Sequence, residues 1–230
     1  MSVVMPHLYR RTITLSRPVL LSGMDLLSII TSVWKRLSEP RQWPDEWQLL
    51  PGMRVNEDGW LEGDGVEIMK AHPSWHYPKL STPHGDPLAI VAHTSATPLG
   101  TAINMAKRRM VPRKPEDRAA SWHISIEDAR VVQMISCEAG AWHAIGGIKG
   151  AGPANRVSVG IELVGYEKGP WPDHQVQQAA RVWRAIVQSY GIKRGLAMVP
   201  HAIIDPDRRS DPGRLWMKDY ADSVVAFAVS

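Results

Sequence analysis

The sequence of 230 residues has a single cysteine and no long apolar run. Because Cys137 has no second thiol to pair with, no internal disulfide is possible, and we expect a small buried side chain there rather than a nucleophile. A membrane-spanning helix needs roughly 20 consecutive apolar residues, and no run approaches that length. The apolar stretch after Arg11 is interrupted by Arg17 and Asp25, so the continuous hydrophobic region of a signal peptide is also missing. We therefore expect synthesis in the cytoplasm without a signal peptide, and no membrane span.

A strong excess of one charge is absent as well. Lysine and arginine total 27 against 23 acidic residues, which gives a formal net charge of +4 and a pI of about 9.3. The basic residues cluster only in two pairs and in the triplet 107–109, and no nucleic-acid-binding motif accompanies them. Such mild basicity is compatible with an anionic polymer such as a cell wall, but it is too diffuse to identify one, and we expect no nucleic-acid partner.

The chain is long enough for one main domain with an extension. Residues 8–21 alternate in the manner of a strand, and residues 22–37 carry apolar side chains at steps of three and four, which predicts a helix. This β-α unit is too small to bury its own apolar face and should pack on the main domain, although an arm that binds substrate or a partner is an alternative. We therefore divide the chain into an N-terminal β-α extension and connector at 1–54 and a main domain at 55–230.

From residue 88 onward, strand and helix patterns alternate as in an α/β domain. Apolar runs predict strands at 88–93, 122–126, 131–135 and 157–164, with a hairpin turn at 127–129. Capping and stop signals predict helices from a cap at Thr97 to Arg109, from a cap at Asp173 to a stop at Gly191, and after Gly213. Four prolines between 71 and 87 forbid a helix there, and a glycine-rich loop is expected at 146–156.

The segment 201–213 carries two metal-binding side chains, His201 and, ten residues later, Asp211. The best third ligand is His93, because the end of a buried strand is a rigid place from which to direct an imidazole. Two histidines and one carboxylate form a catalytic zinc set that leaves the fourth tetrahedral position to water. Another group of histidines lacks regular spacing and an acidic partner and is expected to be solvated or stacked: His72, His76 and His84.

Glu162 lies inside the apolar strand predicted at 157–164. Burying a carboxylate without a partner is costly, so its presence requires an explanation. One explanation is an ion pair with Arg156 or Arg209. The other is a general acid or base whose pKa is raised by burial toward the working pH. Both explanations remain open from the residues alone.

Four blocks of sequence resemble the zinc-dependent N-acetylmuramoyl-L-alanine amidases of type 2, a family that includes phage lysozyme-amidases and peptidoglycan recognition proteins. The blocks are Ala89 to His93, Ala120 to Ile124 with Ala141 to His143, Val159 to Leu163, and His201 through Arg209 to Gly213. Their order and spacing extend the resemblance over roughly residues 55 to 222. The resemblance implies an α/β fold with a central mixed β-sheet flanked by helices. It also implies a zinc ion at one edge of the sheet, in a groove that accepts a peptidoglycan stem.

The resemblance assigns roles to individual residues. His93, His201 and Asp211 would hold Zn²⁺, and Glu162 would stand where the family keeps its catalytic glutamate. Arg209 would replace a basic residue that is usually lysine. Because a guanidinium stays protonated, Arg209 could stabilise an oxyanion but could not donate and reclaim a proton.

Three further residues are implied as substrate contacts: His143, Trp142 and Thr94. For His143 a structural hydrogen bond within the sheet is an equal alternative, and for His123 we expect that structural role.

The implied reaction is hydrolysis of the amide between the lactyl group of N-acetylmuramic acid and L-alanine. We expect a lytic, endolysin-like enzyme that acts on the cell wall. The alternatives are a non-catalytic peptidoglycan-binding module, an amidase that recycles muropeptides in the cytosol, and a zinc hydrolase of another amide. The sequence leaves open whether the substrate is polymeric peptidoglycan or a soluble muropeptide, and it leaves the oligomeric state unknown.

Overall fold

The computed structural model describes Trp47, residues 51–117 and residues 120–230. The strand predicted at 8–21 and the helix predicted at 22–37 lie outside these residues.

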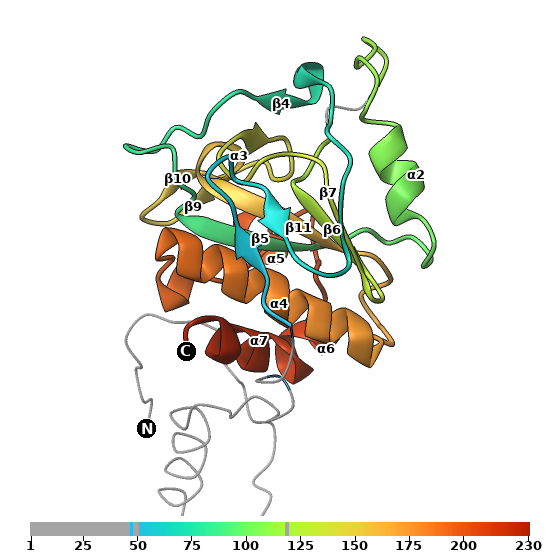
Figure 1. Cartoon of the computed structure of the whole chain (residues 1–230), viewed down its shortest axis with the longest axis vertical. Helices are drawn as coiled ribbons and strands as arrows, with labels where there is room; N and C mark the ends of the chain where they lie inside the picture. The colour runs from blue at the N-terminus through green and yellow to red at the C-terminus, as the bar shows by residue number, and fades with distance from the viewer. Residues whose placement is uncertain (1–46, 48–50, 118–119) are drawn as a thin grey trace, which may run out of the picture. The chain divides into compact units, whose positions relative to one another are not determined.

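A six-stranded sheet in the order β12-β5-β11-β6-β7-β3 forms the centre of the described chain (Figure 1). The first four strands in that order run parallel to one another, β7 runs antiparallel to β6, and β3 runs parallel to β7. The bounds are Val199–Pro200 for β12, Ala89–Thr94 for β5, Ser158–Leu163 for β11, Ile124–Glu127 for β6, Arg130–Gln133 for β7 and Val66–Ile68 for β3. The predicted fold class, a central mixed sheet flanked by helices, is confirmed.

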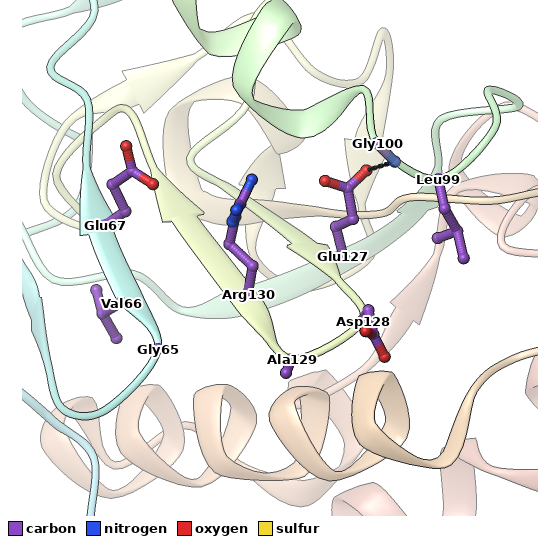
Figure 2. Close-up of a pocket in the computed structure, with 9 residues that line it drawn as sticks. All are labelled: Gly65, Val66, Glu67, Leu99, Gly100, Glu127, Asp128, Ala129 and Arg130. Carbon is purple, nitrogen blue, oxygen red and sulfur yellow. Dashed lines mark hydrogen bonds between the residues drawn. The ribbon is translucent and has the colours of Figure 1, made fainter.

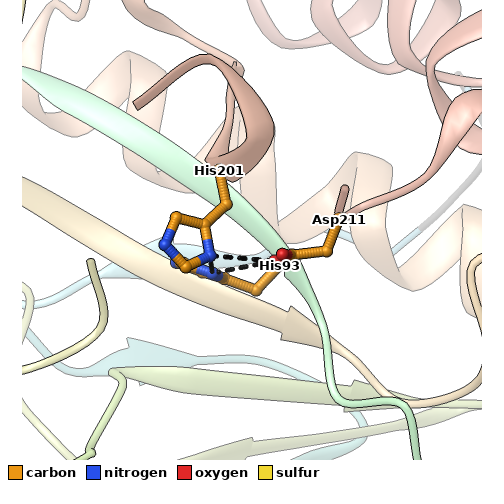
Figure 3. A group of neighbouring side chains, drawn as sticks. All are labelled: His93, His201 and Asp211. Atoms are coloured by element: carbon orange, nitrogen blue, oxygen red, sulfur yellow. Dashed lines mark hydrogen bonds and ion pairs between the residues drawn. The ribbon is translucent and has the colours of Figure 1, made fainter. Parts of the chain in front are cut away.

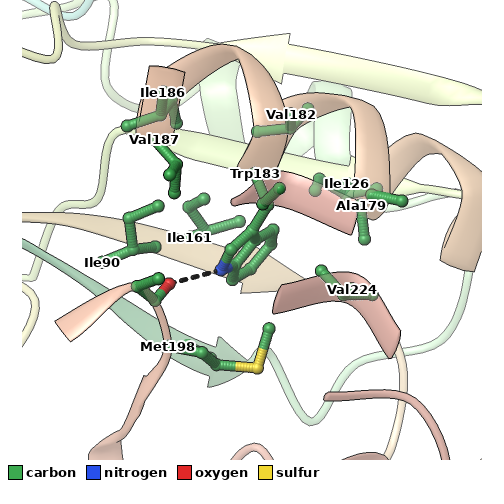
Figure 4. Packing of buried hydrophobic residues seen from close by; sticks show 14 of the residues in the cluster. Ile90, Ile126, Ile161, Ala179, Val182, Trp183, Ile186, Val187, Met198 and Val224 are labelled. Carbon is green, nitrogen blue, oxygen red and sulfur yellow. Dashed lines mark hydrogen bonds between the residues drawn. The ribbon is translucent and has the colours of Figure 1, made fainter. Parts of the chain in front are cut away.

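One face of the sheet is covered by α4 (Asp173–Tyr190), and α7 (Ala221–Ala228) packs against α4. Alternate residues of the parallel strands point toward this layer, where Trp183 is fully buried (Figure 4). Its indole Nε1 donates a hydrogen bond to the Ala197 carbonyl at 2.8 Å, so the ring is both packed and hydrogen-bonded. The predicted apolar stripe of this helix therefore packs into the main hydrophobic core, together with residues of the sheet and of α7.

The ends of the C-terminal helices differ in part from prediction. Gly191 ends α4 with a left-handed φ of 62°, as its stop signal predicted. Asp173 is the first helical residue rather than the cap, because Pro172 occupies the cap position with an extended backbone. The single helix predicted after Gly213 is two helices, α6 (Arg214–Asp219) and α7, because the backbone of Tyr220 departs from helical geometry, with φ −124° and ψ −36°.

The opposite face of the sheet is covered by short elements and loops. Residues such as Val91 and Val132 point to this side and pack in two smaller clusters. The proline-rich stretch 71–87 contains one turn of 3-10 helix, because a proline fits the first position of that turn. The glycine-rich loop expected at 146–156 contains a small hairpin and a short helix that ends at Val157. These elements are η2 (Pro73–Trp75), β4 (His76–Tyr77), β8 (Gly140–Ala141), β9 (Gly147–Ile148), β10 (Gly152–Pro153) and α3 (Ala154–Val157). Strands β1 (Arg54–Val55) and β2 (Leu61–Glu62), η3 (Arg194–Leu196) and α5 (His201–Ile204) complete the described elements.

Helix α2 spans Ala102–Lys107, so the predicted start at Thr97 is wrong. Its free N–H groups are satisfied by Glu127, at the end of β6, whose Oε1 accepts from Gly100, Thr101 and Ala102 at 2.6, 2.8 and 3.2 Å. Figure 2 shows this carboxylate in a surface pocket beside the hairpin turn. The helix therefore begins where a distant strand supplies its acceptor, and not at the local capping signal.

Replacing Glu127 with alanine is expected to lower the free energy of unfolding by about 2 kcal/mol, because three backbone donors lose a charged acceptor. Thr97→Ala, the matched test of the local signal, removes only hydroxyl contacts with Ser95 and Thr101 and is expected to lower the free energy of unfolding by less than about 1 kcal/mol. Urea unfolding followed by circular dichroism measures both. Equal effects of the two substitutions would contradict the assignment of Glu127 as the cap.

The single cysteine is buried, as predicted, and burial raises the pKa of the Cys137 thiol to about 12. Within the described ranges, none of the helices has the length and apolar character needed to cross a membrane.

Candidate metal centre

The sheet order brings two histidines side by side. His93 is the penultimate residue of β5, and the neighbouring edge strand β12 ends at Pro200, which pairs with Ala92. The next residue, His201, therefore lies beside His93. Asp211 joins them because the backbone N–H of Ala202 donates to the Asp211 carbonyl at 3.0 Å, which closes the intervening loop. Figure 3 shows the three side chains directed toward one another.

Three donor atoms of these side chains converge at one point. The Nδ1 atoms of His93 and His201 are 3.0 Å apart, and the Asp211 Oδ2 atom lies 3.2 Å from the first and 3.1 Å from the second. All three residues are buried. Donor atoms that bind a tetrahedral zinc ion at about 2.0–2.1 Å lie roughly 3.3 Å from one another, so this triangle has nearly the required size.

No placement of protons satisfies all three contacts. If both imidazoles donate to Asp211, two N–H groups face each other across 3.0 Å. If one imidazole donates to the other, the accepting nitrogen has no hydrogen to give the carboxylate and faces it lone pair to lone pair. A cation at the centre of the triangle is attracted to all three atoms at once. The donor set therefore fits a bound metal ion better than it fits a hydrogen-bond network.

The pKa values of the site favour the forms of the side chains that bind a cation. Burial lowers the pKa of His93 to about 4, so this imidazole is neutral near pH 7. Burial opposes ionisation of Asp211, but the two imidazoles beside it, His201 and His93, outweigh burial and lower the pKa of the carboxyl group below its usual range. A neutral imidazole and an ionised carboxylate are the states that ligate a metal ion.

Glu162 is the register partner of His93 on the adjacent strand β11. Burial, followed by the negative charge of Asp211, raises its pKa from 4.5 to about 8, while the charges of Arg109 and Arg209 oppose the rise. Its Oε2 atom is buried and has no hydrogen-bond partner among the described residues. The carboxyl group is therefore close to the metal triangle, weakly acidic and available to exchange a proton.

The proposed arginine partners do not pair with Glu162. Arg156 stacks instead on Tyr77, with its guanidinium carbon 3.4 Å from the ring centre. Arg209 is exposed, and no ion pair joins it to Glu162 in the part of the chain that the structure describes. Its charge still lowers the pKa values of Glu162 and His93, so it influences the site electrostatically.

The three predicted substrate contacts differ in what they touch. His143 Nδ1 is 3.0 Å from His93 Nε2. Trp142 is half-buried and packs edge to face against Tyr77. The Thr94 hydroxyl donates to the Pro212 carbonyl at 3.1 Å and so holds the segment that carries Asp211.

His123 has the structural position expected for it. Its ring is fully buried, its Nδ1 accepts from the Gly160 N–H at 2.9 Å, and its Nε2 donates to the Ala139 carbonyl at 2.9 Å. Burial lowers the pKa of His123 to about 4, and both ring nitrogens are satisfied by the backbone.

Two residues near the site were not singled out from sequence. Arg109 lies over the Trp122 ring at 4.0 Å, and burial lowers its pKa to about 10 while the Glu162 charge opposes that change. Its place in a basic triplet at the predicted end of a helix gave no indication of this contact. Asn155 accepts hydrogen bonds from the N–H groups of His143 and Ala144 at 2.8 Å each, and no sequence signal indicated this role.

Glu162 should make the stability of the metal-free protein depend on pH. Because its pKa is raised from 4.5 to about 8, its contribution is complete below pH 4.5 and is lost as the pH rises through 8. Each pKa unit corresponds to about 1.4 kcal/mol, so the full shift sets an upper limit of about 5 kcal/mol. The free energy of unfolding of Glu162→Gln, measured relative to that of wild type, should therefore rise by about 1–3 kcal/mol between pH 4 and pH 9. This is less than the upper limit because partial solvation reduces the effect. Urea titrations of chelator-treated proteins test this, and parallel stability curves would refute it.

In this α/β fold two imidazoles lie at the ends of the adjacent strands β5 and β12, and the loop after α5 brings a carboxylate beside them, which makes a candidate metal site. The family model described as N-acetylmuramoyl-L-alanine amidase matches residues 83–214, which is more than half of the chain. The chain belongs to the N-acetylmuramoyl-L-alanine amidase family.

Individual relatives agree with this membership. The 1,6-anhydro-N-acetylmuramyl-L-alanine amidase AmpD of Escherichia coli strain K12 is 30% identical over 171 residues, which cover 68% of this chain and 89% of AmpD. The N-acetylmuramoyl-L-alanine amidase XlyA of Bacillus subtilis strain 168 is 34% identical over 77 residues, which cover 34% of this chain and 24% of XlyA. A crystal structure of a selenomethionine AmpD derivative superposes with a TM-score of 0.56 at 24% identity, over 74% of this chain and 97% of that one. This structural likeness shows the shared fold.

Proposed function

We propose that this protein is a zinc-dependent amidase that hydrolyses the bond between the lactyl group of N-acetylmuramic acid and L-alanine. The observation that carries the proposal is the triangle of His93, His201 and Asp211 donor atoms, 3.0–3.2 Å apart, beside the buried carboxyl group of Glu162. Membership of the amidase family supports the choice of substrate.

Three residues are assigned to metal binding and one, Glu162, to proton transfer. His93, His201 and Asp211 would hold the zinc ion, which when bound lowers the pKa of a water molecule to about 7 and so makes it nucleophilic near neutral pH. Glu162 takes a proton from the attacking water and returns it to the nitrogen of the departing alanine. In the metal-free site the carboxyl pKa of about 8 lies close to neutral pH, so a modest change in its surroundings moves the group between the form that accepts a proton and the form that donates one.

Arg209 is assigned a role in electrostatic stabilisation rather than in proton transfer. Its guanidinium stays charged, so it stabilises negative charge on the carbonyl oxygen of the scissile amide without moving a proton. Its exposed position on the loop before Asp211 allows it to approach a bound substrate. Trp142, which directly precedes His143 in the chain, remains the proposed aromatic contact for the stem peptide, and the Arg113 guanidinium lies 5.3 Å from its ring.

Two settings for this reaction are proposed. In the first, the enzyme is lytic and endolysin-like and cuts polymeric peptidoglycan. In the second, it recycles soluble muropeptides in the cytosol, a reading favoured by the similarity to AmpD over 89% of that protein's length. Comparing turnover on intact sacculi with turnover on small 1,6-anhydro-muropeptides separates the two settings.

The decisive experiment is release of free stem peptides from purified peptidoglycan and from muropeptides. Cleavage should stop when a chelator removes the metal and return when zinc is added. Zinc binding without cleavage of either substrate would favour a non-catalytic peptidoglycan-binding module. Cleavage of another amide that a muramyl peptide fails to inhibit would indicate a different hydrolase.

A further inference from the structure

The second ring nitrogen of His93 has a defined partner. While Nδ1 faces His201 and Asp211, Nε2 lies 3.0 Å from Nδ1 of His143, and the two rings meet edge to face with centroids 5.2 Å apart. One of these two nitrogens carries the shared hydrogen. Which one carries it determines whether His93 Nδ1 is free to bind a metal ion.

The direction of this hydrogen bond is set at Ser158, the first residue of β11. The Ser158 hydroxyl donates its only hydrogen to the Ala154 carbonyl at 2.7 Å. Its oxygen also lies 3.4 Å from His143 Nε2. Since the hydroxyl hydrogen is already used, the oxygen can only accept from the ring. His143 therefore carries its hydrogen on Nε2.

The rest of the chain of bonds follows from that placement. A neutral His143 with hydrogen on Nε2 has a bare Nδ1, which can only accept. His93 must then donate from Nε2, which leaves its Nδ1 without a hydrogen and directed into the metal triangle. No carboxylate in the described part of the chain pairs with His143 to hold a second proton on its ring.

His143 is held in this position from two sides. Its backbone N–H donates to the Asn155 side chain at 2.8 Å. Its ring lies directly over Gly160, where a Cβ atom would stand only 2.5 Å from the His143 Cγ atom. The absence of a side chain at position 160 therefore makes room for the ring against the sheet.

We infer that His143 is a positioning residue which, through its contact with Ser158, fixes the tautomer of His93 and directs the bare Nδ1 atom toward the metal. Of the two roles that the sequence left open for His143, this one corresponds to the structural hydrogen bond rather than to the substrate contact, and it rests on the proposed zinc site. Residues that support a metal ligand in this way typically contribute about 10–100-fold to metal affinity.

The first test needs no variant. In the metal-free wild-type protein, ¹⁵N–¹H correlation spectra of the histidine rings report which nitrogen carries each hydrogen. We expect the hydrogen on Nε2 in both His93 and His143. A hydrogen on Nδ1 of His93 in the folded protein at pH 7 would overturn the inference.

The second test measures zinc affinity by competition with a chelator. His143→Ala is expected to weaken binding by about 10–100-fold, and His143→Gln, whose amide oxygen can still accept from His93, should weaken it less. His174→Ala, which removes an exposed histidine from α4, should bind zinc like wild type. Ser158→Ala should raise the fraction of His93 with hydrogen on Nδ1, which is visible by NMR even if His143→Ala fails to fold.

The two proposals fail in distinguishable ways. Wild-type protein that binds no zinc would overturn the metal site and this inference together. Tight zinc binding by wild type and equally tight binding by folded His143→Ala would overturn only the role of His143.

Discussion

Asp211→Ala is expected to abolish zinc binding and amide cleavage together. The substitution removes the only charged member of a triangle whose other corners are two imidazoles. Loss of a residue that merely supports a ligand costs about 10–100-fold in affinity, so loss of a direct ligand should cost more than about 100-fold. His93→Ala and His201→Ala should have similar effects, because each also leaves two donors.

Zinc binding in these variants can be measured in two ways. Chelator competition gives the dissociation constant, and the rise in melting temperature on adding zinc gives an independent measure, since a ligand that binds only the folded state stabilises it. Asp207→Ala, which removes an exposed carboxylate from the same loop, is the matched control and should keep both signals. Wild-type affinity in Asp211→Ala would show that the carboxylate is not a ligand.

Glu162→Gln is expected to separate metal binding from catalysis. Glutamine has nearly the same shape as glutamate but cannot take a proton from water, so kcat should fall by roughly 10²–10⁴-fold, the usual contribution of a positioned general base. Zinc affinity should stay near the wild-type value, because Glu162 lies beside the triangle and outside it.

The measurements for Glu162→Gln are the rate of stem-peptide release at saturating substrate and the zinc content of the purified variant. Circular dichroism serves as the folding control. Loss of zinc from the glutamine variant would mean that Glu162 is itself a ligand. An unchanged kcat would mean that another group moves the proton.

The strands and the main helix could be predicted because their signals are local. Runs of buried apolar residues mark β5 and β11, and the three- and four-residue spacing around Trp183 marks α4. The start of α2 was missed because its cap, Glu127, comes from a strand 25 residues farther along the chain than Ala102. A capping signal at Thr97 is visible in sequence, but an acceptor supplied through the tertiary fold is not.

The site shows the same division between local and long-range information. Residue type and the family resemblance indicated His93, His201 and Asp211, and the structure brings their donor atoms together although 118 residues separate the first from the last. A structural hydrogen bond was one of the two roles left open for His143, but its partners, His93 and Ser158, could not be predicted. It depends on a ring that lies over Gly160, and this contact exists only after β11 has joined the sheet.

The position of the donor triangle also bears on how firmly the edge of the sheet is attached. Strand β12 contributes only Val199 and Pro200 to the sheet, so its own backbone pairing with β5 is short. Two corners of the triangle follow this strand in the chain, and the third belongs to β5. An ion held there would act as a crosslink between the C-terminal segment and the centre of the sheet. Its removal should therefore speed amide hydrogen exchange in β12 and α5 well before it affects β11 or α4.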